Sequence, residues 1–142
     1  MDVNVKIEVD QPRIKDIVDS ELIKSVLNMC DDRPQVICLC GSTKFKDTFL
    51  EAQKLLTLQG CVVLSVGCFG HADGHNWDDD TKIALDRLHK WKIKMSDSIV
   101  VCHENGYVGS STKSEIEFAS KLRKSIKWFS LEKLTFDDEY TG

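Results

Sequence analysis

Two kinds of segment alternate along this chain of 142 residues. Short runs made mostly of apolar residues are typical of strands that are buried on both faces of a sheet. Longer segments with an apolar residue at every third or fourth position are typical of helices with one buried face. This alternation predicts an α/β domain of three layers, with a parallel sheet between helices. The expected order is strand 35–40, helix 46–59, strand 61–67, helix 80–95, strand 98–103, helix 111–122 and strand 125–130.

Residues 1–34 do not belong to this alternation and are expected to form an N-terminal appendage. Within them, residues 3–9 alternate between apolar and polar positions, which indicates an edge strand or a disordered arm. Residues 21–29 have helical spacing after a candidate cap at Asp19 or Ser20. Packing, subunit contact or partner binding are the roles expected for this part. The remaining residues, 35–142, have the length of one domain.

Three polar loops each follow a predicted strand, at residues 41–45, 68–80 and 103–115. The carboxyl ends of parallel strands meet at one edge of the sheet, where open α/β sheets bind their ligands. Two of these loops place glycines and hydroxyls before a helix, whose first N–H groups have no partner and bind phosphate well. We therefore expect a pocket for a phosphorylated or hydroxyl-rich small molecule. The expected binding residues are Gly41, Ser42, Thr43, Lys44, Phe69, Gly109, Ser110, Ser111 and Thr112.

Glu115 is the residue that we expect to carry the chemistry of this edge. Its predicted place is the first turn of the helix, where a carboxylate can face whatever the loop binds. The structural alternative is that Ser110 or Ser111 caps the helix and that Glu115 only complements its dipole. Glu117 points about 200° away around the same helix, so it is expected to face solvent or a subunit contact.

Composition excludes several other classes of protein. A net charge of −4 and a pI of about 5.5 argue against a general nucleic-acid binder, which would show a basic face. No apolar stretch approaches the roughly 20 residues that span a bilayer, and the first ten residues lack the apolar core of a signal peptide. Six cysteines occur without a CxxC pair, so we expect them to be buried apolar side chains in a reducing cytosol rather than disulfides or zinc ligands.

The loop at residues 68–80 is rich in glycine, histidine and aspartate. His71, Asp73 and His75 do not have the spacing of helical metal ligands, so we expect neither a metal nor a cofactor. A lid over the pocket, with Phe69 and Trp77 as aromatic contacts, is one interpretation of this loop. A plain solvated loop is the other.

Three stretches together resemble the nucleoside 2-deoxyribosyltransferase superfamily, and within it the 2′-deoxynucleoside 5′-monophosphate N-glycosidases. They are CLCGSTKF at residues 38–45, MSDSIVV at 95–101 and GYVGSSTKSEIEFA at 106–119. The resemblance covers residues 36–128 and implies a flavodoxin-like, Rossmann-like sheet.

The resemblance also implies roles for individual residues. Members of this family cleave the N-glycosidic bond with a glutamate on the helix that follows a Gly/Ser loop, and Glu115 matches that glutamate. The turn at residues 40–42 matches the family's phosphate-side turn. His89 stands where the family has a second carboxylate, and Asp97 is the nearest acid. The catalytic residues expected on this basis are Glu115, His89 and Asp97. Cys38 stands near the family's aromatic hydroxyl.

The expected activity is hydrolysis of a nucleoside or deoxynucleoside 5′-monophosphate to free base and sugar phosphate. Two alternatives stay open: a nucleoside deoxyribosyltransferase that uses the same glycosyl-enzyme, and a nucleotide-sensing module without turnover. The resemblance implies a homodimer or larger homo-oligomer. A cytoplasmic protein without nucleic-acid or membrane partners is expected.

Overall fold

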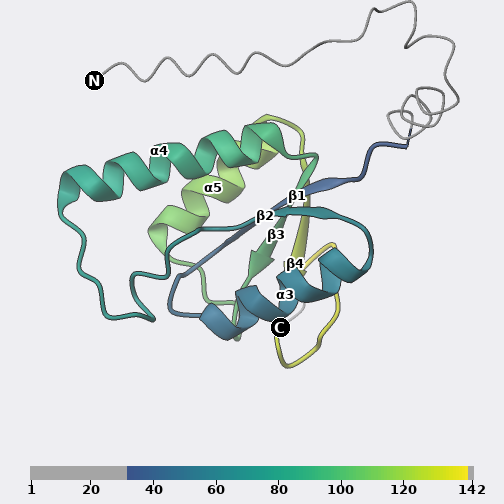
Figure 1. Ribbon diagram of the computed structural model, residues 1–142, viewed down its shortest axis with the longest axis horizontal. Coiled ribbons are helices and arrows are strands. Elements are labelled where there is room, and N and C mark those ends of the chain that lie inside the picture. Colours follow the sequence, from purple (N-terminus) through teal and green to yellow (C-terminus); the bar gives the residue numbers. More distant parts are fainter. Residues whose placement is uncertain (1–31, 141–142) are drawn as a thin grey trace, which may run out of the picture. The chain divides into compact units, whose positions relative to one another are not determined.

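A computed structural model describes residues 32–140, and every structural statement below concerns that part of the chain. The strand and helix expected within residues 1–31 lie outside the described residues. The elements appear in the order strand, helix, strand, helix, strand, helix, strand, as predicted (Figure 1). They are β1 (Val36–Gly41), α3 (Lys46–Leu58), β2 (Val62–Leu64), α4 (Asp79–Met95), β3 (Ser98–Cys102), α5 (Ser110–Lys121) and β4 (Ser125–Phe129).

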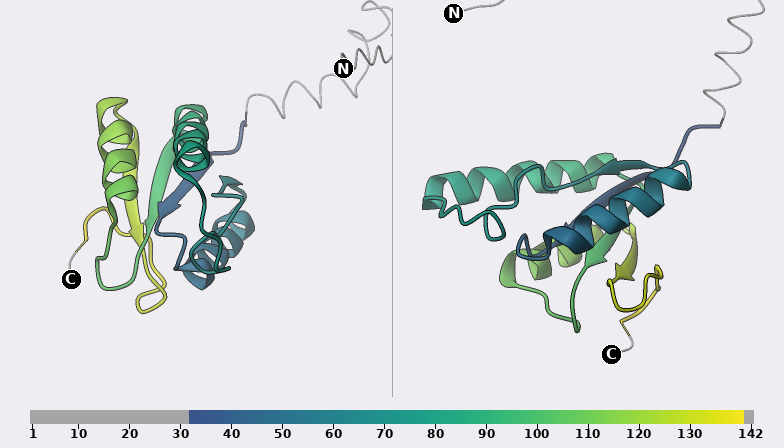
Figure 2. Two further views of the ribbon diagram at one scale, coloured as in Figure 1. Left: turned by 90° about the vertical axis from the view of Figure 1, so that its left-hand side faces the viewer. Right: turned by 60° about the horizontal axis from the view of Figure 1, so that its bottom comes forward.

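The four strands form one parallel sheet in the order β2-β1-β3-β4. The chain leaves β1 toward β2 on one side and then crosses to β3 on the other side of β1. The connections that follow β1 and β3 therefore diverge, and the carboxyl ends of these two strands form the switch point of the sheet. Helix α3 covers one face of the sheet, and α4 and α5 lie side by side on the other (Figures 1 and 2). The prediction of an α/β fold is confirmed.

The core has two layers because side chains alternate between the faces of each strand. Ile37 and Leu39 of β1 pack under α3, against Phe49 and Leu56. The residues between and after them, Cys38 and Cys40, lie on the other face. There they are buried with Ile93 of α4, Ile99 and Val101 of β3, and Ala119 of α5.

Strand β2 is shorter than predicted. It pairs with β1 over only Val36–Cys38 and has no second neighbour in the described sheet. The Nζ of Lys92 binds the carbonyl oxygen of Ser65 at 2.7 Å, and Gly67 adopts a φ of 76°. The apolar run therefore leaves the sheet after Leu64, and a long loop leads to α4.

The acidic composition of the C-terminal residues 131–142 predicts a tail that frays or docks on a partner subunit. For residues 131–140 the structure shows that fraying is wrong. Asp137 pairs with Trp128 through two backbone hydrogen bonds of 2.7 and 2.9 Å. The ring of Phe136 stacks on Phe129, with 4.8 Å between centroids. The tail therefore folds back along β4, because aromatic side chains of that strand give it a surface to pack against.

Gly41 marks the closest approach between β1 and β3. Its φ is +148°, and a Cβ at this position would lie 2.3 Å from the carbonyl oxygen of Cys102. Because β1 and β3 are hydrogen-bonded here, neither strand can move away without breaking the ladder. The switch point is thus built on a residue without a side chain.

We predict that Gly41→Ala lowers the free energy of unfolding by about 3 kcal/mol or more, because backbone strain and steric overlap add. Gly60→Ala is the matched control: Gly60 has a φ of +87° but nothing within 4 Å of the added Cβ. This control should lose about 1 kcal/mol from strain alone. Urea unfolding of both variants measures the difference, and equal losses would contradict the close approach at Gly41.

Candidate active site

A cluster of four polar side chains is buried between the sheet and the helices α4 and α5. Cys38 and Cys40 reach it because alternate residues of β1 face the same side. His89 lies on the inner face of α4, one helical turn before the buried Ile93. Glu115 lies on the inner face of α5, one turn before the buried Ala119. The two cysteines are fully buried, and His89 and Glu115 are 6% and 9% exposed.

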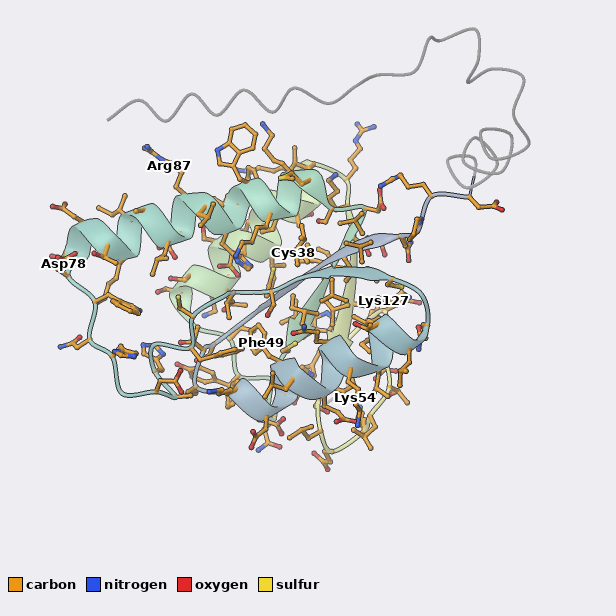
Figure 3. All side chains as sticks on the ribbon, in the orientation of Figure 1. Cys38, Phe49, Lys54, Asp78, Arg87 and Lys127 are labelled. Atoms are coloured by element: carbon orange, nitrogen blue, oxygen red, sulfur yellow. The ribbon has the colours of Figure 1, made fainter. Side chains whose placement is uncertain are left out.

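The imidazole of His89 joins the members of this cluster. Its Nε2 lies 3.6 Å from Sγ of Cys38 and 3.5 Å from Sγ of Cys40. The same nitrogen lies 3.9 Å from Oε2 of Glu115. Figure 3 labels Cys38 on the strand beneath α4. One ring nitrogen therefore contacts two sulfurs and a carboxylate within a layer that is otherwise apolar.

Burial and mutual contact change the pKa values of these groups. Burial raises the pKa of Glu115 to about 7, although His89 acts to lower it. A hydrogen bond with Cys40 lowers the pKa of the Cys38 thiol to about 6, with His89 acting in the same direction against burial. Burial lowers the pKa of His89, but the bond and charge of Cys38 outweigh this and raise it overall. Burial raises the pKa of Cys40. A Cys38 thiolate beside a His89 imidazolium is the state that these shifts favour.

The structure corrects two details of the helix that carries Glu115. Helix α5 begins at Ser110, so Glu115 lies in its second turn and not in the first. The cap is Gly109, without a side-chain hydrogen bond, and the predicted cap at Ser110 or Ser111 is wrong. The expectation for Glu117 is confirmed, because this residue is exposed while Glu115 is buried.

Asp97 is placed away from this cluster. It immediately precedes β3, at the opposite end of that strand from α5. Its Oδ2 accepts a hydrogen bond from the N–H of Val36 at 2.8 Å, and its own N–H donates to the Val36 carbonyl oxygen at 2.7 Å. These bonds join the beginnings of β1 and β3. The structure therefore brings together His89 and Glu115, and does not bring Asp97 to them.

The turn after β1 lies next to the loop after β3, as expected for two loops at one edge. The Nζ of Lys44 is 3.5 Å from the ring centroid of Tyr107, a contact that joins the two loops. Within the turn, the Oγ of Ser42 accepts a long hydrogen bond of 3.4 Å from the N–H of Lys44. Helix α3 then begins without a side-chain cap on its first N–H groups, and Thr43 Oγ1 accepts from the N–H of His71 at 3.3 Å.

The other predicted binding residues take different positions. Ser110 and Ser111 are exposed at the start of α5, whereas Thr112 is 2% exposed and packs inward. Phe69 packs edge-to-face against Phe49, with 5.4 Å between ring centroids. It therefore belongs to the layer under α3, on the opposite face of the sheet from Glu115.

The loop before α4 is held to the first turn of α3. Lys46 and Asp73 form an ion pair of 3.0 Å, and the rings of His75 and Trp77 stack with 5.1 Å between centroids. Among the described residues, the histidines and aspartates of this loop do not form a metal-ligand cluster. Whether the loop acts as a lid stays a prediction.

The surface of the described domain includes two hollows. One, of about 370 Å³, adjoins the start of α3, and the other, of about 440 Å³, runs between α4 and α5. The first is lined by Lys44, Phe45, Lys46, Asp47, Thr48, Ala72, Glu104 and Leu131. The second is lined by Ile83, Asp86, Arg87, Lys90, Trp91, Lys94 and Phe118.

Sequence reasoning missed Cys38 and Cys40 as members of a site. The available signal was their spacing, because two cysteines at alternate positions of a buried strand must face the same layer. Asp86 was also missed. It lines the hollow between α4 and α5, and its negative charge contributes to the raised pKa of Glu115.

No helix in the described part of the chain is long and apolar enough to cross a membrane. A scan against protein-family models and a search of curated proteins found no match to this chain.

Proposed function

We propose that this protein hydrolyses the N-glycosidic bond of a nucleoside or deoxynucleoside 5′-monophosphate, with Glu115 as the nucleophile. The observation that carries the proposal is the buried pair of Glu115 and His89, 3.9 Å apart, on the two helices over the β1–β3 switch point. The resemblance of residues 38–45, 95–101 and 106–119 to the N-glycosidases of nucleoside monophosphates supports the same reaction. The family membership is part of the proposal.

Each residue of the pair has a distinct role in this mechanism. In the first step, a carboxylate oxygen of Glu115 bonds to C1′ of the sugar while the bond from C1′ to the base nitrogen breaks. The base leaves with that electron pair and takes a proton from the His89 imidazolium. In the second step, water attacks C1′, gives its proton to His89 and frees Glu115. The products are the free base and the sugar phosphate.

Two features of the pair suit it to these steps. A Glu115 carboxylate held in an apolar layer is poorly solvated, so less water must be removed from it before it attacks. Because burial raises the pKa of Glu115 to about 7, this reactive ionised form predominates above neutral pH. Contact with Cys38 raises the pKa of His89 against the effect of burial, which favours the imidazolium form that can donate a proton to the leaving base. His89 would thus replace the second carboxylate of the resembled family.

The phosphate is proposed to bind at the turn of residues 41–44. The first N–H groups of α3 lack a side-chain cap, so they can donate to an anion. Lys44 and Lys46 line the hollow of about 370 Å³ beside this helix start. The positive charge of Lys44 favours a monophosphate over an uncharged nucleoside, whereas Lys46 is paired with Asp73 at 3.0 Å.

Two alternatives use the same site. In a deoxyribosyltransferase, a second base instead of water would accept the sugar from Glu115. In a nucleotide-sensing module, the ligand would bind without turnover. The observation that favours the second alternative is the position of Asp97, which leaves Glu115 as the only carboxylate in contact with His89 among the described residues.

Self-association is also proposed, because α4 exposes several large apolar side chains, among them Ile83, Leu88 and Trp91. Contact between two copies of this face would bury them. Light scattering that shows a monomer at micromolar concentration would count against it. A cytoplasmic location is proposed as well, since the cysteines of the described domain are free thiols.

We predict that Glu115→Gln retains the fold and nucleotide binding but loses turnover by a factor on the order of 10⁴, because an amide does not attack C1′. The matched control is Glu117→Gln, an exposed position on the same helix, which should keep full activity. A panel of nucleosides and nucleotides is incubated with each protein, and released base is measured by chromatography. Base release that persists in Glu115→Gln would remove the glycosyl-enzyme mechanism, and ligand-dependent stabilisation without any base release would favour the sensing module.

We predict that Ser42→Ala weakens binding of a nucleoside monophosphate about fivefold to tenfold, because a hydroxyl beside the phosphate is lost. Binding of the matching nucleoside should change little. Ser120→Ala, at an exposed position near the end of α5, serves as the control. Titration calorimetry gives the six affinities, for the nucleotide and the nucleoside with the unaltered protein and each of the two variants. Equal losses for nucleotide and nucleoside would show that residues 41–44 do not hold the phosphate.

A further inference from the structure

The four buried polar groups also have the composition of a metal site. Cys38 Sγ, Cys40 Sγ and His89 Nε2 all lie within 4.8 Å of one another. The carboxylate of Glu115 adds an oxygen 3.9 Å from the same Nε2. Strand β1 and helix α4 thus direct three donor atoms at a common point. Helix α5 holds the Glu115 carboxylate beside the imidazole, outside that group of three.

The spacing of these atoms is close to that around a tetrahedral zinc ion. With zinc–sulfur bonds of about 2.3 Å and zinc–nitrogen or zinc–oxygen bonds of about 2.0–2.1 Å, a tetrahedral site places two sulfurs about 3.8 Å apart, a sulfur and a nitrogen about 3.6 Å apart, and a nitrogen and an oxygen about 3.4 Å apart. The observed distances from Nε2 to the two sulfurs are 3.6 and 3.5 Å. The Glu115 oxygen lies 3.9 Å from Nε2 and is not among the atoms that all lie within 4.8 Å of one another, so the carboxylate must move toward the sulfurs to complete the site.

The chemical type of the donor atoms indicates which metal ion the site would bind. Two sulfurs and an imidazole nitrogen favour zinc and disfavour magnesium and calcium, which prefer oxygen ligands. We propose that Cys38, Cys40, His89 and Glu115 bind a zinc ion in a four-coordinate site between the sheet and the helices α4 and α5.

The fold supplies the rigidity that such a site needs. Cys38 and Cys40 lie on β1, which is hydrogen-bonded to β2 on one side and β3 on the other. Both cysteines are fully buried, whereas the side chains of His89 and Glu115 are 7% and 11% exposed. The imidazole and the carboxylate are therefore the more exposed members of the cluster.

Zinc binding has a consequence for catalysis, and this consequence rests on the proposed function. The ion would occupy Nε2 of His89 and the carboxylate of Glu115, the two groups assigned to proton donation and nucleophilic attack. The zinc-loaded protein is therefore inactive as an N-glycosidase, and the metal-free protein is the active form. Metal binding itself does not depend on that activity.

Cobalt titration of the full chain tests the site directly. The protein is stripped with a chelator, dialysed under reducing conditions, and titrated with Co²⁺. We expect one ion per chain, thiolate-to-cobalt charge-transfer absorption and the intense visible bands of tetrahedral cobalt. Zn²⁺ should then abolish these bands by displacing the cobalt. A protein that gives no thiolate-to-cobalt band would overturn the proposal.

Substitutions of the individual residues test which of them are ligands of the metal ion. We expect cobalt to bind about 100-fold more weakly, or worse, to the double variant Cys38→Ser/Cys40→Ser and to the single variant His89→Asn. Loss of a residue that supports a metal ligand already weakens binding about 10-fold to 100-fold, and loss of the ligand itself should cost at least as much. Cys68→Ser removes an exposed thiol and should bind cobalt like the unaltered protein. Circular dichroism verifies that each variant is folded. Cobalt binding that survives in the folded His89→Asn variant with unchanged affinity and bands would contradict the assignment.

Glu115→Gln separates the fourth ligand from the other three. We expect it to keep the charge-transfer band, because both thiolates remain, and to bind cobalt more weakly. Unchanged affinity would overturn the role of Glu115 as the fourth ligand. Cobalt binding is measured spectroscopically, so it is independent of base release. If the metal-free protein releases no base, the proposed function is refuted and the zinc site stands. If cobalt does not bind, the zinc site is refuted and the proposed function stands.

Discussion

The structure depends on the position of β1 in the centre of its sheet. This strand is hydrogen-bonded on both edges and covered on both faces, so every one of its side chains from Ile37 to Cys40 is buried. Alternation then assigns Ile37 and Leu39 to the layer under α3 and the two cysteines to the layer under α4 and α5. The switch point at Gly41, the loops around it and the polar cluster beneath the helices all follow from that placement.

Burying this cluster opposes folding unless its members satisfy one another. Removing a carboxylate and an imidazole from water costs several kcal/mol when they lack partners. Here Nε2 of His89 lies against two sulfurs and the Glu115 carboxylate, and the pKa shifts follow from these contacts. An apolar set of side chains would fill the same layer with less penalty. The presence of four reactive groups at this point is therefore an argument for chemistry or metal binding.

Local patterns predicted most of the fold, and tertiary contacts decided the rest. The order of strands and helices was readable from apolar spacing, and the opposite exposure of Glu115 and Glu117 from helical geometry. The early end of β2 could not be predicted from the sequence, because it depends on where this edge strand loses its pairing with β1. The folded tail depends on the rings of Trp128 and Phe129. The cluster of Cys38 and Cys40 with His89 requires α4 to cross β1, which no stretch of sequence encodes by itself.

The most direct test of Glu115 as the reacting group is to trap its covalent intermediate. Chelator-treated protein is mixed with a nucleoside monophosphate that releases base, quenched in acid within milliseconds, digested and mapped by mass spectrometry. A sugar phosphate attached to the peptide of residues 114–121, and localised to Glu115 by fragmentation, is the predicted result. Base release with no adduct on this peptide, or with an adduct on Glu117, would contradict the assignment of Glu115 as the nucleophile.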